Sequence, residues 1–341
     1  MSGEFSFGPV IAKLLERRSL DTAEAAGAMV EIMEGAATPA QVAGFVVALR
    51  AKGETTDEVV GLVETMRSYA TRISVGGPLL DTCGTGGDRA GTFNVSTVAA
   101  IVCAGAGAKV AKHGNRAASS RCGSADVLEA LGVNIDLEPA AVVRCIAEAS
   151  IGFCFAPRFH PAMRHAAAPR RELGVATVFN FLGPLTNPAG AAHQALGVSD
   201  PRMLDVMVET LGRLGSEHVV AFHGHGGIDE LSLSGPSQVV ELDNGKLDRW
   251  ILDPAGLGLA PAEIGAIAGG TATENAVMVR SVLDGEPGPR RDVVVLNTAA
   301  GLVAAGISDG FQAGLDAAAE AIDSKSAARA LDRLITVSNE P

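Results

Sequence analysis

Apolar residues in the first 70 positions recur at three- and four-residue spacing, the pattern of amphipathic helices. Polar start signals separate these stripes. Asp21 with Glu24 and Thr38 with Gln41 have the spacing of capping boxes, as do Thr55 and Glu58. The pattern predicts a small helical bundle without evident chemistry, followed by a linker over residues 72–78. The clearest apolar stripes are Val42, Phe45, Val46 and Leu49, and then Val59, Val60, Leu62, Val63 and Met66.

From residue 79 the pattern changes to short apolar runs that alternate with helices, which indicates a mostly parallel sheet covered by helices. We therefore expect an α/β fold with a helical domain at 1–75, an α/β domain at 76–341, and a further helical segment near 165–190 that joins the first domain. Residues 237–242 and 247–252 predict a hairpin at an edge of the sheet. The expected strands before it are Leu79–Thr82, Lys109–Lys112, Val133–Ile135, Gly152–Phe155, Ala195–Val198 and Val219–His223.

Composition narrows the function. A length of 341 residues favours two domains, and the net charge of −12 argues against nucleic acid as the main partner. No apolar run is long enough to span a membrane, and the first residues do not have the pattern of a signal peptide. The five cysteines are odd in number and lack paired metal-ligand spacing, so we expect reduced thiols in a cytoplasmic protein.

A glycine-rich segment, residues 81–97, connects the first expected strand to an Ala-rich helix. Glycines allow close backbone approach to a ligand, and the free N–H groups at a helix start attract anions. Asn94, Ser96 and Thr97 lie where the first helical turn needs caps or a phosphate needs donors. The segment predicts a phosphate site, although a tight strand-to-helix turn explains the glycines equally well.

A second loop, residues 112–126, also joins a strand to a helix, so its polar groups lie at the same carboxyl edge of the sheet. Lys112, Arg116 and Arg121 supply positive charge. Ser119, Ser120 and Ser124 supply hydroxyl groups near a helix start. Few solvated turns concentrate so many cations and hydroxyls, and we therefore interpret the loop as an anion site. His113 taken alone is more typical of a packed histidine than of a base.

Asp229 and Glu230 are adjacent carboxylates at the end of an expected strand. Such a pair is usually part of a solvated turn, but beside two anion loops it becomes the best Mg²⁺ site in the chain. A fourth segment, residues 155–174, mixes arginines with aromatic residues and could bind a planar aromatic acid. For Arg158 and Arg164 we favour an exposed cationic helix face.

These segments together resemble the anthranilate phosphoribosyltransferase family. The resemblance extends in order over essentially the whole chain, with Arg121-Cys122 and Pro289-Arg290-Arg291 as its small departures. The matching pieces are Gly84-Thr85-Gly86-Gly87-Asp88, Asn94 to Thr97, Lys112 to Arg116, Gly123 to Asp126, His160-Pro161 through Arg170-Arg171, Phe179 to Pro188, Asp229-Glu230, Glu274-Asn275-Ala276 and Leu296-Asn297.

The resemblance implies transfer of the phosphoribosyl group of phosphoribosyl pyrophosphate to the amine of anthranilate, with release of pyrophosphate, in a homodimer that uses two Mg²⁺ per monomer. It implies that Ser96, Asp229 and Glu230 hold the metal, that Gly84, Asn115 and Arg170 contact anthranilate, and that Lys112, His113 and Asn115 stabilise the transition state. The implied contacts to phosphoribosyl pyrophosphate are Gly84, Gly87, Asp88, Thr92, Asn94, Val95, Ser96, Thr97, Lys112, His113, Gly114, Asn115, Arg116, Ala117, Ala118, Ser119, Ser120 and Ser124.

Two alternatives share this architecture. A pyrimidine nucleoside phosphorylase would have a Lys-His-Ser-Thr-Gly-Gly run, whereas here Lys112-His113 precedes Gly-Asn and Thr85-Gly86-Gly87 stands apart. A non-catalytic paralogue that binds nucleic acid is disfavoured by the net charge of −12 and by the intact carboxylate pair.

Overall fold

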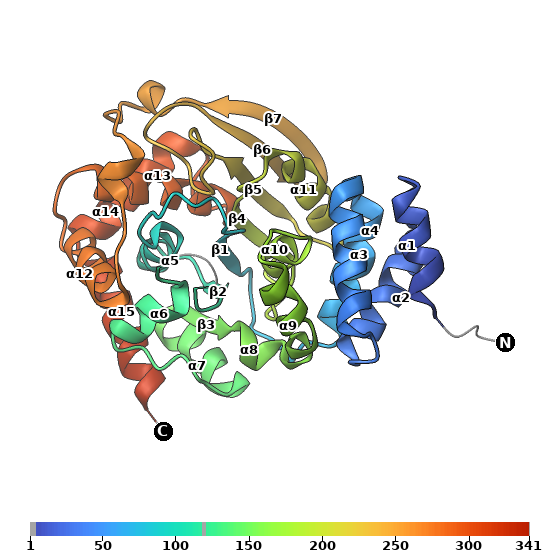
Figure 1. Ribbon diagram of the computed structural model, residues 1–341. Coiled ribbons are helices and arrows are strands. Elements are labelled where there is room, and N and C mark those ends of the chain that lie inside the picture. The colour runs from blue at the N-terminus through green and yellow to red at the C-terminus, as the bar shows by residue number, and fades with distance from the viewer. Residues whose placement is uncertain (1–4, 118–120, 341) are drawn as a thin grey trace.

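The N-terminal part of the chain is a helical bundle (Figure 1), seen in a computed structural model that describes residues 5–117 and 121–340. The predicted capping boxes at Asp21 and Thr38 are complete, and at Thr55 the Glu58 carboxylate accepts from the Thr55 N–H at 2.8 Å. Asp21 accepts from the N–H of Glu24 at 2.8 Å, and the Glu24 carboxylate accepts from the N–H of Asp21 at 2.8 Å. These caps satisfy N–H groups that helix starts leave open. The bundle helices are α1 (Phe7–Leu15), α2 (Thr22–Met33), α3 (Pro39–Lys52) and α4 (Thr56–Ser68).

A seven-stranded sheet forms the centre of the larger part, in the order β3-β2-β1-β4-β5-β6-β7. The first five strands along the chain are parallel, and β6 and β7 are antiparallel at one edge, as the sequence predicted. Asn244 and Gly245 join β6 to β7 and both have positive φ, which a tight hairpin turn needs. The strands are β1 (Leu80–Gly84), β2 (Val110–Gly114), β3 (Ile151–Phe155), β4 (His193–Gly197), β5 (His218–His223), β6 (Ser237–Asp243) and β7 (Lys246–Leu252).

One expected strand, Val133–Ile135, does not form. Strand β2 pairs directly with β3, the edge strand, so this segment does not come between them in the sheet. Its backbone bonds elsewhere: the N–H of Val133 donates to the carbonyl of Leu128, and the N–H of Asn134 donates to the Ser338 hydroxyl. Val133 and Ile135 are buried in the core all the same. The apolar run was identified correctly, but its hydrogen-bonding partners are a turn and a helix.

Helices cover both faces of the sheet. On one face α5 and α13 pack on the strands, with α14 and α15 outside them. On the other face α11 packs on β5 and β6, and its buried residues share one apolar cluster with the bundle. These helices are α5 (Val95–Gly105), α6 (Ser124–Ala130), α7 (Pro139–Ala149), α8 (Ala156–Phe159), α9 (Arg164–Leu173), α10 (Phe179–Leu182), α11 (Leu204–Arg213), α12 (Ala272–Leu283), α13 (Pro289–Ala304), α14 (Phe311–Asp323) and α15 (Ser326–Asn339).

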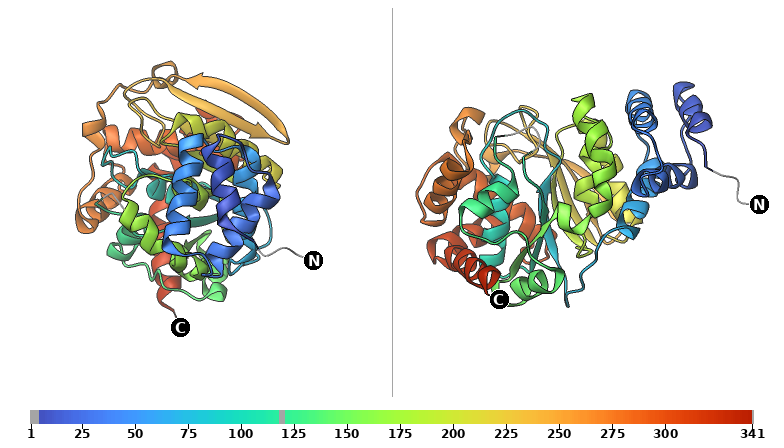
Figure 2. Two further views of the ribbon diagram at one scale, coloured as in Figure 1. Left: turned by 45° about the vertical axis from the view of Figure 1, so that its right-hand side comes forward. Right: turned by 60° about the horizontal axis from the view of Figure 1, so that its bottom comes forward.

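Helices α9 and α10 lie between the bundle and the sheet (Figure 2). Helix α9 contacts α2 and α3, and α10 contacts α4. Ala166, Phe179 and Phe181 are buried in the cluster that includes the bundle core. Segments far apart in sequence therefore share one apolar interior, with burial as the main stabilising contribution.

All five cysteines are buried thiols. Burial raises the pKa of the Cys122 and Cys145 thiols to about 11 and that of Cys83 well above its ordinary value. Among the described residues, no helix combines the length and apolar character needed to cross a membrane.

Candidate active site

The β1–α5 loop begins at the carboxyl end of β1 and turns through glycines with positive φ. Gly86, Gly87 and Gly91 have φ of 68°, 81° and 66°, values that residues with a side chain rarely adopt. The N–H of Gly86 donates to Asp229 Oδ2 at 2.7 Å. The first glycine loop is thus held directly against one of the two carboxylates that the sequence singled out.

Three carboxylates meet beside this loop. Ligand atoms of Asp88, Asp229 and Glu230 all lie within 4.8 Å of one another. Burial and the neighbouring Asp88 charge raise the pKa of Asp229 to about 7, and burial followed by the Asp229 charge raises that of Glu230 well above its usual value. Thr92 Oγ1 donates to Glu230 Oε1 at 3.3 Å. Three carboxylates this close together repel one another unless they are protonated or bind a cation.

The donor set fits magnesium. Oδ2 of Asp88 and Oε2 of Glu230 are buried and have no hydrogen-bond partner among the described atoms, so both are available to a metal. Mg²⁺ prefers carboxylate oxygens and keeps several waters. The resemblance implies a substrate contact for Asp88, and the structure adds this residue to the carboxylate cluster. Ser96 lies on the first turn of α5 with Oγ 3.4 Å from Lys112 Nζ, and its metal role stays a prediction.

Lys112 is buried beneath the first loop at 2% exposure. Its Nζ donates to the carbonyl of Thr82 at 2.6 Å. Desolvation lowers the pKa of Lys112, against the opposing attraction of Asp81, whose own pKa is raised by burial. The positive charge expected from Lys112 is therefore internal to the sheet edge, where it compensates a buried carboxylate.

His113 is buried next to His160, with ring centroids 5.0 Å apart. Burial, with a smaller contribution from His160, lowers the pKa of His113 to about 3, and burial lowers that of His160 to about 4. Both rings are neutral at pH 7, which agrees with the prediction of a packed histidine. Nε2 of each ring has no partner among the described atoms, so His113 can still donate to or accept from a bound ligand.

The second loop follows β2 and is closed by contacts to the start of α6. Ser124 Oγ donates to the carbonyl of Asn115 at 3.2 Å, and the N–H of Ala117 donates to Asp126 Oδ2 at 2.9 Å. Arg116 forms ion pairs with Asp126 and Glu129 at 3.0 and 2.8 Å, so its charge is engaged within the protein. Ala118, Ser119 and Ser120 lie outside the described residues.

The start of α5 connects the first loop to two other segments. Asn94 precedes the helix but does not cap it with its side chain, contrary to one of the expected uses. Its Nδ2 donates to the carbonyl of Cys122, and its Oδ1 accepts from Asn275 Nδ2 at 2.8 Å. Asn94 therefore holds the two loops at a fixed separation. Val95 and Thr97 are buried behind it.

Arg170 and Arg171 differ in their surroundings. Arg170 lies partly buried on α9, with its guanidinium 5.3 Å from the centre of the Phe179 ring, and burial lowers its pKa. Arg171 is exposed. A guanidinium that is partly desolvated and lies over an aromatic ring, like that of Arg170, suits a planar carboxylate ligand. The solvated guanidinium of Arg171 suits such a ligand less well.

Asp81, Asn187 and His160 support the site, and the sequence predicted no role for any of them. Asp81 is fully buried and accepts from the N–H of His113 and from Asn187 Nδ2, the latter at 2.8 Å. His160 lies against His113. The local signal was a charged residue inside an apolar strand, and the partners of Asp81 lie 32 and 106 residues further along the chain.

The fold and this site define a transferase of the glycosyl transferase type. The glycosyl transferase family, a/b domain, matches residues 76–328, and the helical bundle domain of the same family matches residues 8–70. An anthranilate phosphoribosyltransferase of Roseiflexus castenholzii is 54% identical over 96% of this chain and 97% of its own length. Among solved structures, the anthranilate phosphoribosyltransferase of Thermus thermophilus has a TM-score of 0.91 and 46% identity, over 97% of this chain and 99% of that one.

The enzyme from Saccharomyces cerevisiae in complex with PRPP (phosphoribosyl pyrophosphate) and Mg has a TM-score of 0.88 and 28% identity, over 97% of each chain. The chain described here belongs to the anthranilate phosphoribosyltransferase family.

Proposed function

We propose that this chain transfers the phosphoribosyl group of phosphoribosyl pyrophosphate to the amine of anthranilate, in the tryptophan biosynthetic pathway, with Mg²⁺ as cofactor. The observation that carries the proposal is the cluster of Asp88, Asp229 and Glu230 beside a glycine loop at the carboxyl edge of the sheet. Ligands of open α/β sheets bind at that edge. A site that gathers acidic oxygens beside a glycine loop at a helix start suits a polyphosphate bound together with a divalent cation.

The two loops divide the sugar substrate between them. In this proposal the glycine loop after Gly84, with Gly87, Asp88 and Thr92, would contact the pyrophosphate, and the second loop, with Asn115 and Ser124, would contact the remaining phosphate and the ribose. Asn94 fixes the distance between the loops through the carbonyl of Cys122. We also propose that each monomer binds two Mg²⁺ ions. The boundary between the helical domain and the α/β domain is proposed to lie between residues 75 and 76.

Anthranilate is proposed to bind between the sheet edge and helices α9 and α10. Arg170, held over Phe179, would pair with its carboxylate, while Gly84 and Asn115 would contact it from the two loops. Exposure of Arg171 supports the choice of Arg170 as the ligand.

Departure of pyrophosphate leaves positive charge on the ribose, so the protein must stabilise the leaving group and orient the amine. Bound Mg²⁺ would supply electrostatic stabilisation of the leaving pyrophosphate. Neutral His113 can hydrogen bond to a substrate through Nε2, and Asn115 can orient the nucleophile. Lys112 would act through the loop that it supports. Anthranilate is already a nucleophile, so the absence of a strong base from this scheme is chemically consistent.

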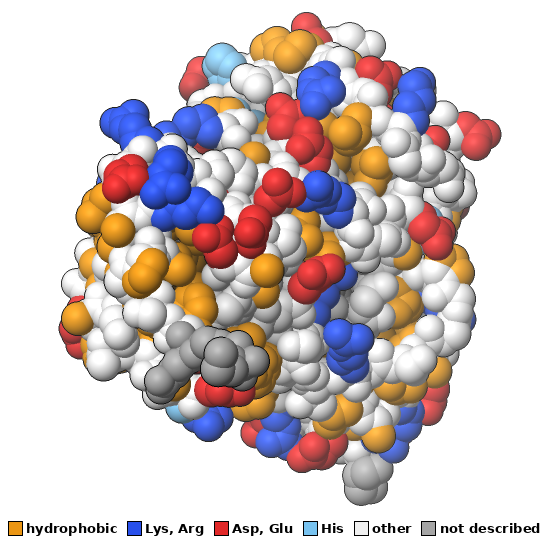
Figure 3. Space-filling model, turned by 90° about the vertical axis from the view of Figure 1, so that its right-hand side faces the viewer, with side chains coloured by type: hydrophobic (Ala, Val, Ile, Leu, Met, Phe, Trp, Pro, Cys, Tyr) orange, Lys and Arg blue, Asp and Glu red, His pale blue; other side chains and the backbone are white. Residues whose placement is uncertain are grey.

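A homodimer formed through the bundle is proposed, together with a cytoplasmic location. Figure 3 shows the face that carries the bundle, where acidic and basic side chains are interspersed with hydrophobic ones. Leu15 of α1 and Val47 of α3 are 72% and 43% exposed, which gives this region apolar area for a second copy. The mixed charge on this face does not offer nucleic acid a basic surface.

A fluorescence assay tests the proposed activity. Purified protein with phosphoribosyl pyrophosphate and Mg²⁺ should consume anthranilate fluorescence, and EDTA should stop the consumption. Turnover of thymidine and phosphate without loss of anthranilate would instead identify a nucleoside phosphorylase. Salt-sensitive binding of single-stranded DNA without either turnover would support the nucleic-acid alternative.

A further inference from the structure

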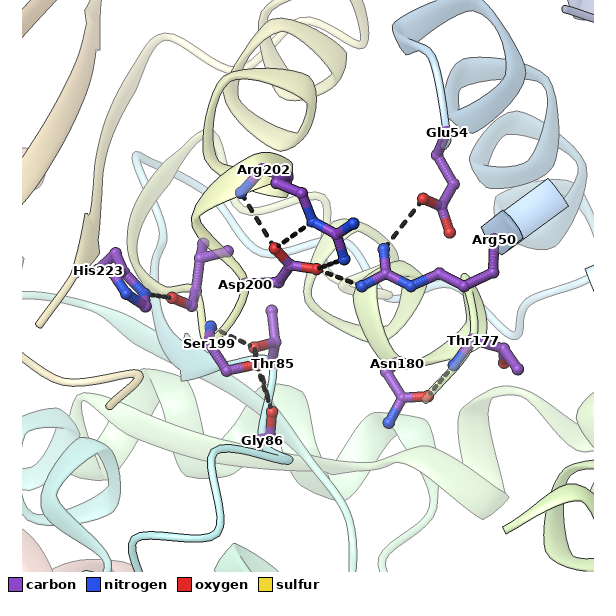
Figure 4. A network of polar contacts seen from close by, with 11 residues as sticks. Arg50, Glu54, Thr85, Gly86, Thr177, Asn180, Ser199, Asp200, Arg202 and His223 are labelled. Carbon is purple, nitrogen blue, oxygen red and sulfur yellow. Dashed lines mark hydrogen bonds and ion pairs between the residues drawn. The ribbon is translucent and has the colours of Figure 1, made fainter. Parts of the chain in front are cut away.

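A network of polar contacts connects the bundle to the glycine loop through the residues that follow β4 (Figure 4). Arg50, at the end of α3, donates through Nη1 to Glu54 at 3.0 Å and through Nη2 to Asp200. Its guanidinium also lies 5.1 Å from the centre of the Phe181 ring on α10. The side chain of Arg50 thus contacts three places: the end of its own helix, helix α10 and the segment after β4.

Asp200 receives further donors from its own side of this contact. Arg202 binds it through Nε at 3.0 Å and Nη2 at 2.7 Å, and the backbone N–H of Arg202 adds a third bond at 3.1 Å. The Arg202 and Arg50 guanidinium groups keep the pKa of Asp200 well below its usual range. Two arginine side chains therefore hold this carboxylate in its ionised form.

Ser199, immediately before Asp200, holds the glycine loop. Its N–H donates to Thr85 Oγ1 at 3.0 Å, its hydroxyl is 2.9 Å from the same oxygen, and its Oγ donates to the carbonyl of Gly86 at 2.8 Å. Gly86 in turn donates its N–H to Asp229 at 2.7 Å. The path from Ser199 to a proposed metal ligand therefore contains only Thr85 and Gly86.

The end of β4 is itself firmly positioned. His223 Nδ1 lies 2.7 Å from the carbonyl of Val198, and the N–H of Val198 donates to Phe222 of β5. A Cβ at Gly197 would lie 1.6 Å from the carbonyl oxygen of Asp229, so this residue must be glycine for the two segments to pack. Ser199 thus reaches the loop from a segment that packs directly on Asp229.

We propose that Ser199 and Asp200 are positioning residues for the glycine loop, and that Arg50 fixes them relative to the bundle. None of the three is among the residues that the resemblance assigns to either substrate. The inference rests on the proposed function, because its consequence is tighter binding of phosphoribosyl pyrophosphate with Mg²⁺. Anthranilate, proposed to contact Arg170 on α9, should be affected much less.

Ser199→Ala removes both hydroxyl contacts at almost constant volume. Isothermal titration calorimetry with phosphoribosyl pyrophosphate and Mg²⁺ should show a dissociation constant raised about 10-fold, because two hydrogen bonds that order the loop are lost together. The KM for anthranilate should change less than about twofold, because the carboxylate of anthranilate is proposed to contact Arg170 on α9 and not the Ser199 segment. Ser199→Thr retains the hydroxyl and should restore most of the affinity. Arg50→Gln should weaken binding in the same direction.

Asp57→Asn is the matched control. Asp57 pairs with Arg213 between α4 and α11, so it also joins the bundle to the larger part, but away from the glycine loop. This variant should leave the dissociation constant unchanged. If Ser199→Ala fails to fold, Thr85→Val breaks the same hydroxyl pair from the loop side and replaces it in the titration.

Two results would overturn the inference: an unchanged dissociation constant in the folded Ser199 or Thr85 variant, or equal weakening by Asp57→Asn. Failure of the proposed function looks different. In that case the unsubstituted protein itself would neither bind phosphoribosyl pyrophosphate nor consume anthranilate.

Discussion

Replacing Asp88 by Asn should stabilise the metal-free protein while it weakens magnesium binding. Asp88, Asp229 and Glu230 have ligand atoms within 4.8 Å of one another, and no described cation neutralises them. Asp88 is the second largest cause, after burial, of the raised Asp229 pKa. Asparagine keeps the shape of the side chain and removes its charge.

The magnitude follows from the separation. Two unit charges 4.8 Å apart repel by roughly 3.5 kcal/mol at an effective dielectric constant of about 20. Partial exposure of Asp88 and Asp229 to water reduces this to about 1–2 kcal/mol. The gain depends on pH because Asp229 has a pKa raised to about 7. It should be present at pH 8, where Asp229 is ionised, and largely absent at pH 5, where the folded protein holds the proton.

Urea denaturation in EDTA at pH 5 and pH 8 measures this effect directly. Asp88→Asn should raise the free energy of unfolding at pH 8 only, and it should raise the Mg²⁺ concentration needed for half-maximal activity. Asp309→Asn, an exposed carboxylate outside the site, serves as the control and should do neither. Equal destabilisation by Asp88→Asn at both pH values would refute the electrostatic reasoning.

Three further predictions concern other parts of the site. Arg170→Ala should raise the KM for anthranilate by about 10-fold or more and that for the sugar substrate little, whereas Arg171→Ala should change neither beyond about twofold in steady-state kinetics. Lys112→Met should lower the free energy of unfolding by about 1–3 kcal/mol in urea because it leaves the carbonyl of Thr82 without its donor and Asp81 without a nearby positive charge, and a double variant with Asp81→Asn should recover part of this loss. Because the His113 pKa is lowered to about 3, the folded protein excludes a proton that the unfolded chain accepts, so stability should fall as pH drops from about 6.5 toward 3. His113→Gln should reduce that slope in denaturation curves, and an unchanged slope would contradict the assigned burial.

The periodic pattern predicted most of the fold because burial imposes it locally. The bundle helices, the parallel strands and the edge hairpin all follow from side-chain spacing and from turn residues such as Asn244-Gly245. The prediction of a strand at Val133–Ile135 was wrong because an apolar run specifies burial but does not specify the partner of its backbone hydrogen bonds. The N–H of Val133 bonds within the preceding turn, and that of Asn134 bonds to Ser338 on α15, 204 residues later in the chain.

The site was predictable where chemistry lies in adjacent residues. Asp229-Glu230 and the two loops could be identified from their own composition, and the structure brings the first loop and the pair together. The position of Lys112 beneath the loop could not, because it depends on a contact with the neighbouring strand β1. The ion pairs of Arg116 could not either, because they depend on how the loop folds back onto helix α6. A sequence shows that a cation is present, whereas only the fold shows whether its charge is available to a ligand.

The buried thiols have a practical consequence for labelling. The thiolate is the nucleophile toward maleimides and iodoacetamides, and burial both hides these sulfurs and raises their pKa. Native thiols should therefore react slowly with such reagents. New cysteines placed at Val175, just after the bundle-packed helix α9, and at Ile251 on the edge hairpin, both exposed, would then react with dyes in preference to the native thiols. Energy transfer between them would report how the bundle moves relative to the sheet during turnover, without prior removal of the natural cysteines.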